Sequence, residues 1–377
     1  MLSATSVAVR SSARQAIRPS APIAAAPISN RCHNRSFSIS STRALAISHP
    51  CRTSHSTRKV LKQTVASIGN KCGYATTTNP NPPLGKKNAS NNVPSRIGLI
   101  GARGYTGQAL IDLLNDHPLM DLRHVSSREL TGQELQGYTK RKIIYENLLP
   151  EDVARLDKDV DCWVMALPNN VCKPYIEALD RVQEGSDHKS VVVDLSADYR
   201  FDSSFSYGLP ELTKRSEICQ STRISNPGCY ATAAQLAIAP LVEHLDGQPV
   251  VFGVSGYSGA GAKPNEKNDV NRLRDNIIPY SLTGHIHERE ISHHLGTSVA
   301  FMPHVASWFR GIHLSVTIPL NKAMSSRDVL QLFQDRYAGE KLVKVVGEPP
   351  LVRSLAKQHH CEIGGFVMDS TGKRVVV

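Results

Sequence analysis

The most constraining feature of the sequence is a glycine turn between a short strand and a helix. Residues 96–100 (RIGLI) predict a compact strand, residues 101–107 (GARGYTG) form the turn, and residues 108–114 (QALIDLL) have helical apolar spacing. In this context the glycines let backbone N–H groups approach a pyrophosphate at the helix N-terminus. A tight turn of structural use alone is the alternative. The candidates for cofactor binding are Gly101, Gly104, Tyr105, Thr106 and Gly107.

The next strand ends in a segment that bears on the choice of cofactor. Residues 122–125 (LRHV) predict this strand, and Ser126-Ser127-Arg128 follows it, about twenty residues after the glycine turn. NAD enzymes tend to place an acid here, whereas two hydroxyls and a guanidinium suit a 2′-phosphate. We therefore predict NADP(H), bound through Ser126, Ser127 and Arg128; an ordinary solvated strand end is the alternative.

Alternating strands and helices predict the fold of this part of the chain. Residues 160–167 (VDCWVMAL) and 191–195 (VVVDL) have the composition of buried parallel strands, with a helix expected over residues 171–182. The pattern predicts an α/β, Rossmann-like doubly wound parallel sheet with ligands beyond the carboxyl ends of its strands. Pro168 and Ser196 fall at such ends and are further cofactor-binding candidates.

A cysteine lies where the next strand turns into a helix. Residues 221–224 predict a short strand, residues 225–228 (SNPG) a sharp turn, and residues 231–241 a buried helix rich in Ala and Leu. Cys229 therefore lies at or just before a helix N-terminus, where orphan N–H groups and the helix dipole favour an anion. This placement predicts a lowered thiol pKa and a nucleophile. A small buried cysteine in a strand–helix corner is the alternative.

The second half has a different pattern. We expect strands over residues 250–254, 311–320, 343–346, 363–368 and 374–377, and an amphipathic helix over residues 325–337 that starts at a Ser cap. This pattern predicts an α+β domain with a mainly antiparallel sheet. A second glycine-rich loop, residues 255–261 (SGYSGAG), follows the first of these strands. Its backbone at Gly256 and Ser258 is a candidate for contacting the cofactor, and a mobile connector is the alternative.

Residues 285–291 (HIHEREI) form the second chemical cluster. An H-x-H pair with no convincing third ligand does not make a zinc site, and no two cysteines have C-x-x-C spacing, so we predict neither a metal nor a disulfide framework. An acid–base histidine that serves Cys229 is the functional alternative, because thiol chemistry needs a proton acceptor and later a donor.

The positive charge of the chain is confined to its beginning. Of 44 Lys and Arg, fifteen lie in the first 111 residues, which contain no Asp or Glu; the remainder has 29 basic against 33 acidic residues. Residues 1–92, rich in Ser, Ala and Arg, have the composition of an organelle transit peptide, so we predict import into the mitochondrial matrix. The apolar stretches of this leader are too short to span a membrane. A basic arm that binds nucleic acid is the alternative, and we expect neither a nucleic-acid nor a membrane partner.

Seven motifs occur together and in order. They are GARGYTG (101–107), VVDLSADYR (192–200), YGLPEL (207–212), NPGCYAT (226–232), SGYSGAG (255–261), HIHEREI (285–291) and MPH (302–304) with Arg310-Gly311. Over residues 93–377 the chain resembles the N-acetyl-γ-glutamyl-phosphate reductases, in their eukaryotic mitochondrial form. NPGCYAT is the most specific motif, because the related aspartate-semialdehyde and glyceraldehyde-phosphate dehydrogenases carry other residues around the cysteine.

The resemblance implies a reaction in arginine biosynthesis. The Cys229 thiolate attacks N-acetyl-L-glutamyl 5-phosphate, phosphate leaves, and NADPH reduces the resulting thioester to N-acetyl-L-glutamate 5-semialdehyde. In this frame His285 is the acid–base residue, and the Cys229 N–H with Asn226 stabilises the oxyanion. The implied substrate-binding residues are Asn226, His287, Arg310 and Arg200.

The resemblance also implies a domain plan. We expect a leader over residues 1–92, an NADP-binding domain over 93–228, a catalytic and dimerisation domain over 229–358, and C-terminal strands over 359–377. Family members usually continue past the last strand with a helix that returns to the nucleotide domain. We therefore expect the chain as given to expose the apolar surface that such a helix covers.

Partners and alternatives follow from the same resemblance. It implies a homo-oligomer, either a dimer or a tetramer, and acetylglutamate kinase as a partner. One alternative is another acyl-phosphate or semialdehyde dehydrogenase of the same superfamily. The other is a weakly active NADP-binding partner of that kinase.

Overall fold

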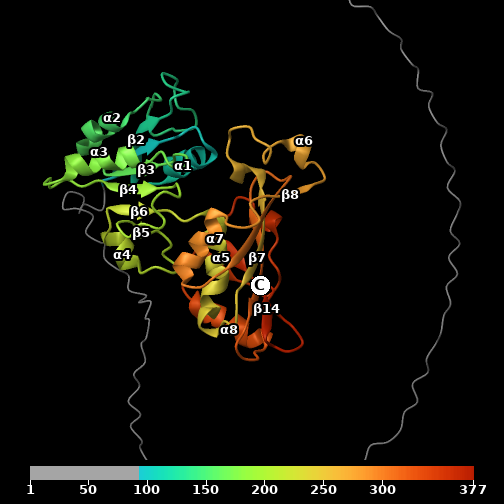
Figure 1. The fold of residues 1–377 in the computed structure, drawn as a ribbon. Coiled ribbons are helices and arrows are strands. Elements are labelled where there is room, and N and C mark those ends of the chain that lie inside the picture. The colour runs from blue at the N-terminus through green and yellow to red at the C-terminus, as the bar shows by residue number, and fades with distance from the viewer. Residues whose placement is uncertain (1–92) are drawn as a thin grey trace, which may run out of the picture. The chain divides into compact units, whose positions relative to one another are not determined.

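A computed structural model describes residues 93–377, whose helices and strands gather around two six-stranded sheets (Figure 1). These residues belong to one continuous unit of the chain. The predicted transit peptide and lead-in, residues 1–92, lie outside the described residues. Within residues 93–377, no helix is long and apolar enough to cross a membrane.

The first sheet is parallel throughout, in the order β2-β1-β3-β4-β6-β5. The chain runs outward from β1 in both directions, which creates a switch point between β1 and β3 and confirms the predicted Rossmann-like sheet. The short edge strand β5 was not predicted. The strands are β1 (Ser95–Ile100), β2 (Met120–Ser126), β3 (Cys162–Met165), β4 (Val191–Asp194), β5 (Ser206–Tyr207) and β6 (Arg223–Ser225).

Helices cover the two faces of this sheet unequally. Helix α1 (Tyr105–Asp116) packs on one face, and α2 (Pro150–Leu156) and α3 (Lys173–Gln183) cover the other face together, around Trp163 and Met165 (Figure 1). A short 3₁₀ turn (Asp157–Asp159) follows α2, and α4 (Arg215–Gln220) is the segment of the chain that connects β5 to β6.

The face that α1 covers carries a hollow of about 1130 Å³, lined by β1, β3 and β4. Leu113 and Met120 line this hollow and are 50% and 38% exposed. A sheet of parallel strands is normally buried on both faces, so this apolar surface is unusually open.

The second sheet has the order β13-β14-β10-β7-β9-β8. Only the β7–β9 pair is parallel within this sheet, which confirms the prediction of a mainly antiparallel arrangement. Strands β8 and β9 were not predicted. The strands are β7 (Val250–Gly256), β8 (Ile277–Pro279), β9 (Ala300–Ala306), β10 (Ile312–Pro319), β13 (Val367–Met368) and β14 (Arg374–Val376).

The predicted strand over residues 363–368 is divided in two. Gly365 and Phe366 both have positive φ angles, 99° and 36°, which an extended strand cannot contain. The part before this bend is β12 (Cys361–Ile363), which pairs with β11 (Val343–Val345) in a separate two-stranded sheet, and the part after it is β13.

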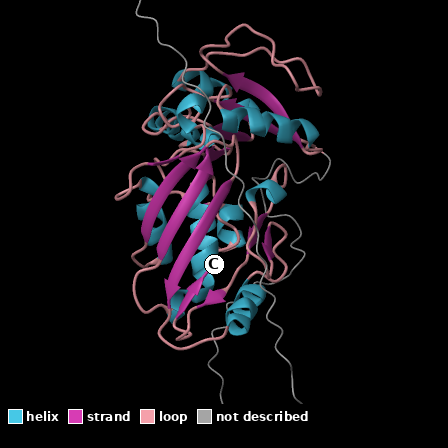
Figure 2. Ribbon diagram, turned by 90° about the vertical axis from the view of Figure 1, so that its right-hand side faces the viewer, coloured by secondary structure: helices cyan, strands magenta, loops and turns pink. Residues whose placement is uncertain are grey.

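Three helices pack on one face of the second sheet, behind its long strands in Figure 2. They are α5 (Cys229–Ile238), α7 (Ile286–Leu295) and α8 (Ser326–Arg336), and Tyr230, Phe301 and Phe333 lie in the core between helices and sheet. Helix α8 begins at Ser325, whose hydroxyl accepts from Asp328 N, which confirms the predicted Ser cap. The remaining helices are α6 (Val270–Leu273) and the 3₁₀ turns Ala239–His244, Tyr257–Ala260 and Val352–Leu355.

Candidate active site

The turn before α5 presents Cys229 as the first residue of the helix, as predicted. Gly228 is the N-cap residue, and no side chain caps the helix. The first hydrogen bond of the helix runs from Thr232 N to Gly228 O (2.8 Å), so the N–H groups of residues 229–231 have no partner within the helix. Cys229 keeps an exposed surface. An approaching anion or oxyanion would therefore meet both the thiol and open backbone donors.

The predicted lowered thiol pKa is wrong for the unliganded chain. Burial raises the pKa of Cys229, and this effect outweighs the N–H groups of Tyr230 and Cys229 and the charge of Arg200, which lower it. Tertiary packing thus overrides the helix terminus, and the resting thiol is neutral at pH 7.

Two histidines reach this turn from α7. His287 Nε2 lies directly against Gly228, because a Cβ on that glycine would stand 2.3 Å from it. His285 is the N-cap of α7: its Nδ1 accepts a hydrogen bond from His287 N (3.1 Å). The two imidazole rings are 4.8 Å apart. The structure therefore places His287 against the cysteine turn and His285 next to His287.

Both histidines are neutral at pH 7. Burial, followed by the charge of Lys267, lowers the pKa of His285. Burial, followed by His285 and Arg200, lowers the pKa of His287 to about 3. His287 Nδ1 is buried without a hydrogen-bond partner among the described residues. Because His285 Nδ1 accepts a hydrogen bond, its proton lies on Nε2.

The low pKa of His287 predicts a loss of stability in acid. The unfolded histidine takes up a proton near its ordinary pKa of about 6.5, whereas the folded one does so only near about 3. Between these values the unfolded state binds more protons, so the free energy of unfolding falls as the pH falls. We expect this group to account for a loss of about 2 kcal/mol between pH 7 and pH 5, measured by urea unfolding.

His287→Gln should reduce that loss. His293→Gln, which removes an exposed histidine from the same helix, is the matched control. An equal pH dependence in wild type and His287→Gln would contradict the prediction.

Gly228 is required for space rather than for backbone conformation. Its φ of −67° is open to any residue, but an added Cβ would lie 2.3 Å from His287 Nε2 and 2.7 Å from an Arg200 nitrogen. Gly228→Ala should therefore displace His287 and lower kcat by about 10- to 100-fold with a folded protein. Gly347→Ala is the control, because this exposed glycine has no positive φ and a Cβ there would meet nothing within 4 Å. A wild-type kcat in Gly228→Ala would refute the close packing.

The remaining substrate-binding candidates lie in different surroundings. Arg200 is 7% exposed, and its guanidinium donates to Asn226 O (2.9 Å), Glu290 (2.9 Å) and Leu195 O (3.2 Å). Asn226 is exposed beside Cys229, and its amide donates to Pro227 O (3.1 Å). Arg310 is exposed above the Phe309 ring. Substrate contact by these three residues stays a prediction.

The glycine turn fits a pyrophosphate. Gly101 has a φ of 88°, and a Cβ there would lie 2.3 Å from Ala166 O, so no other residue fits. Gly104 is the N-cap of α1, and a Cβ there would meet only Gly101 O at 3.9 Å, so the space above it is open. Gly107 packs against the Ala102 backbone. Helix α1 starts at Tyr105, which places the predicted Tyr105, Thr106 and Gly107 in its first turn, where N–H groups lack intrahelical partners.

The strand-end candidates differ in what they can offer a ligand. The Ser126 hydroxyl accepts from Leu148 N (3.0 Å), Ser127 is buried, and Arg128 is exposed. Pro168 is exposed beyond β3, while the buried Ser196 hydroxyl donates to Asp194 (2.7 Å).

Arg103 was not among the cofactor-binding candidates from the sequence. It lies in the glycine turn, and its guanidinium pairs with Glu129 (2.9 Å), the residue after Arg128. A signal was present in the sequence, because a basic residue interrupts the small residues of the turn. Only the fold brings that turn to the end of β2, where Gly101 N and Ala102 N donate hydrogen bonds to Ser126 O.

The second glycine loop comes together with the first turn. Tyr257 N and Ser258 N donate to Trp308 O (3.0 Å) and Phe309 O (2.9 Å), and the packing at Gly256 leaves no room for a Cβ. The Phe309 ring in turn lies edge-on to Tyr105, with centroids 5.2 Å apart. The loop is therefore anchored beside the start of α1.

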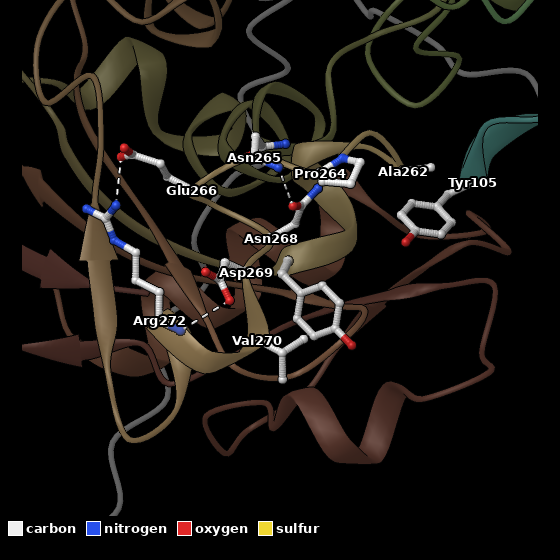
Figure 3. Close-up of a pocket in the computed structure, with 10 residues that line it drawn as sticks. Tyr105, Ala262, Pro264, Asn265, Glu266, Asn268, Asp269, Val270 and Arg272 are labelled. Carbon is white, nitrogen blue, oxygen red and sulfur yellow. Dashed lines mark hydrogen bonds and ion pairs between the residues drawn. The ribbon is translucent and has the colours of Figure 1, made fainter. Parts of the chain in front are cut away.

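A hollow of about 600 Å³ lies between Tyr105 and the segment that follows this loop. Figure 3 shows Tyr105 at one side and the Glu266–Arg272 ion pair (2.8 Å) at the other, with Asp269 between them. Within residues 93–377, no three His, Cys, Asp or Glu side chains are grouped to hold a metal ion.

Comparisons with known proteins define the class. Residues 96–221 match the NAD-binding domain of semialdehyde dehydrogenases, and residues 229–377 match their dimerisation domain. Aspartate semialdehyde dehydrogenase II of Vibrio cholerae, solved with ASA, shares the fold with a TM-score of 0.60 at 14% identity, over 75% of this chain and 91% of that one. The enzyme of Candida albicans, solved with NADP, gives a TM-score of 0.56 at 16% identity, over 75% and 93%. The chain is thus of the semialdehyde dehydrogenase class.

Curated relatives narrow this class to one family. The N-acetyl-gamma-glutamyl-phosphate reductase of Stenotrophomonas maltophilia is 49% identical over 76% of this chain and 89% of its own length, so the chain belongs to this reductase family. "Protein arg-6, mitochondrial" of Neurospora crassa is 66% identical over 82% of this chain, and "Protein ARG5,6, mitochondrial" of Candida albicans is 56% identical over 80%. The chain spans about a third of the length of these two fungal relatives, 36% and 35%.

Proposed function

We propose that the chain reduces N-acetyl-L-glutamyl 5-phosphate to N-acetyl-L-glutamate 5-semialdehyde and phosphate, with NADPH as the reductant. The observation that carries this proposal is the exposed Cys229 at the first position of α5, beside open N–H groups and His287, with His285 next to that histidine. The reductase family to which the chain belongs supports the substrate.

In the proposed reaction the thiol of Cys229 first gives up its proton. Because the resting thiol is neutral, a proton acceptor is required, and His285 is proposed for this role since its imidazole is neutral at pH 7. The sulfur then forms a bond to the acyl carbon, and the bond from that carbon to the phosphate oxygen breaks, so that phosphate leaves with the electron pair. The N–H of Cys229 and Asn226 stabilise the carbonyl oxygen while it carries negative charge.

The thioester is then reduced. When bound, NADPH supplies a hydride to the thioester carbonyl. The carbon–sulfur bond breaks, its electron pair returns to sulfur, and the aldehyde is released. The proton held on the histidine restores the Cys229 thiol. Covalent capture divides one difficult step into easier ones.

We infer NADPH rather than NADH from the end of β2. Arg128 is exposed there, and Arg103 approaches the same point from the glycine turn. Glu129, the residue after Arg128, is paired with Arg103 rather than free to accept from ribose hydroxyls. Two guanidinium groups at this point suit a 2′-phosphate.

This inference predicts a change of cofactor preference. Arg128→Ala should lower the ratio of kcat/KM for NADPH over NADH by about tenfold, and Arg103→Ala should have an effect of the same sign, because each removes a charge-assisted contact to the 2′-phosphate. Binding of 2′,5′-ADP, followed by calorimetry, should weaken in parallel. Arg155→Ala removes an exposed arginine of α2 that pairs with Asp152, and serves as the control. An unchanged ratio in both variants would refute the assignment.

Partners and location are proposed from the relatives. We propose a homo-oligomer formed through the second domain, a mitochondrial location, and acetylglutamate kinase as the partner. The matched dimerisation domain and the mitochondrial names of the fungal relatives support the first two. Phe252 of β7 is 40% exposed on the sheet face opposite α5, α7 and α8, a surface suited to a second copy.

The test of the function is a reverse assay on the purified chain. N-acetylglutamate 5-semialdehyde, phosphate and NADP⁺ should give NADPH absorbance that depends on phosphate. NAD⁺ and aspartate semialdehyde are run in parallel. Turnover of aspartate semialdehyde instead would favour another member of the superfamily. NADPH binding without turnover of either substrate would favour a weakly active binding partner.

A further inference from the structure

Beneath the cysteine turn lies a buried carboxylate that the proposed mechanism does not use. Glu290 of α7 has no exposed surface. Its Oε1 accepts from Gly228 N (2.8 Å) and from the Tyr207 hydroxyl (2.8 Å), and its Oε2 accepts from the Arg200 guanidinium (2.9 Å). The carboxylate therefore contacts the residue directly before the nucleophile.

This arrangement requires a group that only accepts hydrogen bonds. The Arg200 guanidinium and the Gly228 N–H can only donate. Burial and the charge of Glu290 raise the pKa of Tyr207, so the phenol stays protonated, and it already accepts from Gln235 (2.7 Å) while it donates to Glu290. An amide in place of the carboxylate would direct its NH₂ group at one of these donors. The site is thus built for an ionised glutamate.

The three donors come from separate segments. Arg200 follows β4, Tyr207 lies in β5, and Gly228 caps α5, whereas Glu290 lies in α7. One turn further along α7, His294 Nε2 forms a hydrogen bond with Arg200 O (2.8 Å). The His294 ring also stacks on the Tyr207 ring, with centroids 3.5 Å apart. Helix α7 therefore joins the loops at the carboxyl ends of the parallel sheet to the turn that carries Cys229.

We propose that Glu290 is a positioning residue that fixes the cysteine turn, so that the Cys229 thiol and the open N–H groups of α5 meet the acyl group in the reactive geometry. Arg200 and Tyr207 hold the carboxylate in place. Because the Gly228 N–H is bonded to Glu290, the donors left for an oxyanion are those that follow it in the chain. The effect on turnover rests on the proposed function, whereas the effect on the thiol does not.

The same pair of charges acts on the thiol in opposite directions. Glu290 raises the pKa of Cys229 and Arg200 lowers it. The other titratable groups around this sulfur include Tyr230 and Tyr280, on which Cys229 acts electrostatically, and His287 against Gly228 with His285 next to it. Removing the carboxylate should therefore lower the pKa of the Cys229 thiol and at the same time lower kcat. A residue that only supports the fold would not produce this combination.

The experiment compares Glu290→Gln, Glu290→Asp and Arg200→Met in the full chain. Each variant is tested by the pH dependence of iodoacetamide alkylation at the Cys229 peptide, by steady-state kinetics and by melting temperature. In Glu290→Gln we expect the alkylation midpoint to fall and kcat to fall by about 100-fold with KM nearly unchanged. Glu290→Asp keeps the negative charge on a shorter side chain, so we expect kcat to fall while the alkylation midpoint stays near the wild-type value. Arg200→Met should raise the midpoint.

Asp157→Asn is the matched control. Asp157 is a buried carboxylate, 3% exposed, that accepts from Trp163, Gln183 and Ser190 beneath α2 and α3. This variant should lose thermal stability but keep the wild-type alkylation midpoint. A lower melting temperature in Glu290→Gln with an unmoved midpoint, or an equal shift in Asp157→Asn, would overturn the proposal.

If Glu290→Gln does not fold, a second variant tests the proposal. Tyr207→Phe removes one donor and leaves the carboxylate, and we expect about a tenfold lower kcat with an unchanged KM; an unchanged kcat would contradict the proposal. If the wild-type chain shows no turnover, the proposed function fails, and the alkylation midpoints alone decide whether Glu290 controls the thiol.

Discussion

Cys229→Ser is expected to lower turnover by at least about 10⁴-fold and to leave NADPH binding intact. The serine side chain fits the first turn of α5, because it replaces sulfur with a smaller atom at an exposed position. A hydroxyl is a far weaker nucleophile than a thiolate at neutral pH, and the neighbouring imidazoles cannot compensate for that difference. The cofactor candidates on the glycine turn are untouched by the substitution.

The measurement combines the reverse assay with NADPH fluorescence. Cys219→Ser makes the same replacement in α4, outside the turn that carries the nucleophile, and should keep full activity. Robust turnover in Cys229→Ser would remove the thioester from the mechanism. Loss of NADPH binding in the same variant would mean that the substitution damaged the fold, which the melting temperature would show.

His285→Asn is expected to lower kcat by about 10³-fold, because it removes acid–base catalysis while keeping the helix cap. His285 has two functions in the structure: its ring is proposed to manage the thiol proton, and its Nδ1 caps α7 by accepting from His287 N. Asparagine is a good N-cap residue but does not titrate. His285→Ala removes both functions, so the difference between the two variants isolates the cap.

Kinetics and thermal melting separate these contributions. We expect His285→Asn to melt near the wild-type temperature and His285→Ala to be less stable by about 1 kcal/mol. Ser325→Ala removes the cap of α8, where Ser325 accepts from Asp328 N, and should cost similar stability without loss of kcat. Near wild-type activity in His285→Asn would assign His285 to the cap alone and leave His287 as the proton acceptor.

Local features predicted the nucleotide half well. The strand, glycine turn and helix of residues 96–114 are specified by neighbours in the chain: a bend with positive φ at Gly101, small residues where backbone segments meet, and helical spacing after them. The parallel sheet followed from the alternation of strands and helices. The start of α5 at Cys229 was predicted in the same way, from Pro227 and Gly228.

The second sheet was harder to predict because its strands depend on distant partners. Strand β9 contains Pro303, which argues against a central strand, yet it lies between β7 and β8 and pairs with both. Its place in the sheet is decided by residues about fifty positions away, such as Val251 opposite Phe301. The expected strand over residues 363–368 breaks at a bend that no apolar pattern revealed.

The sequence by itself determined the candidates for the chemistry: the glycine turn, the cysteine after a tight turn, and the two histidines at H-x-H spacing. Only the tertiary structure decided the state of these groups. The thiol pKa is raised because packing against the sulfur outweighs the helix terminus. Glu290 lies in the HIHEREI motif but received no role from the sequence, since a glutamate within a helix looks like a solvated residue until its three donors are known. Residue type and spacing are local properties, whereas desolvation and hydrogen-bond partners are set by what packs around them.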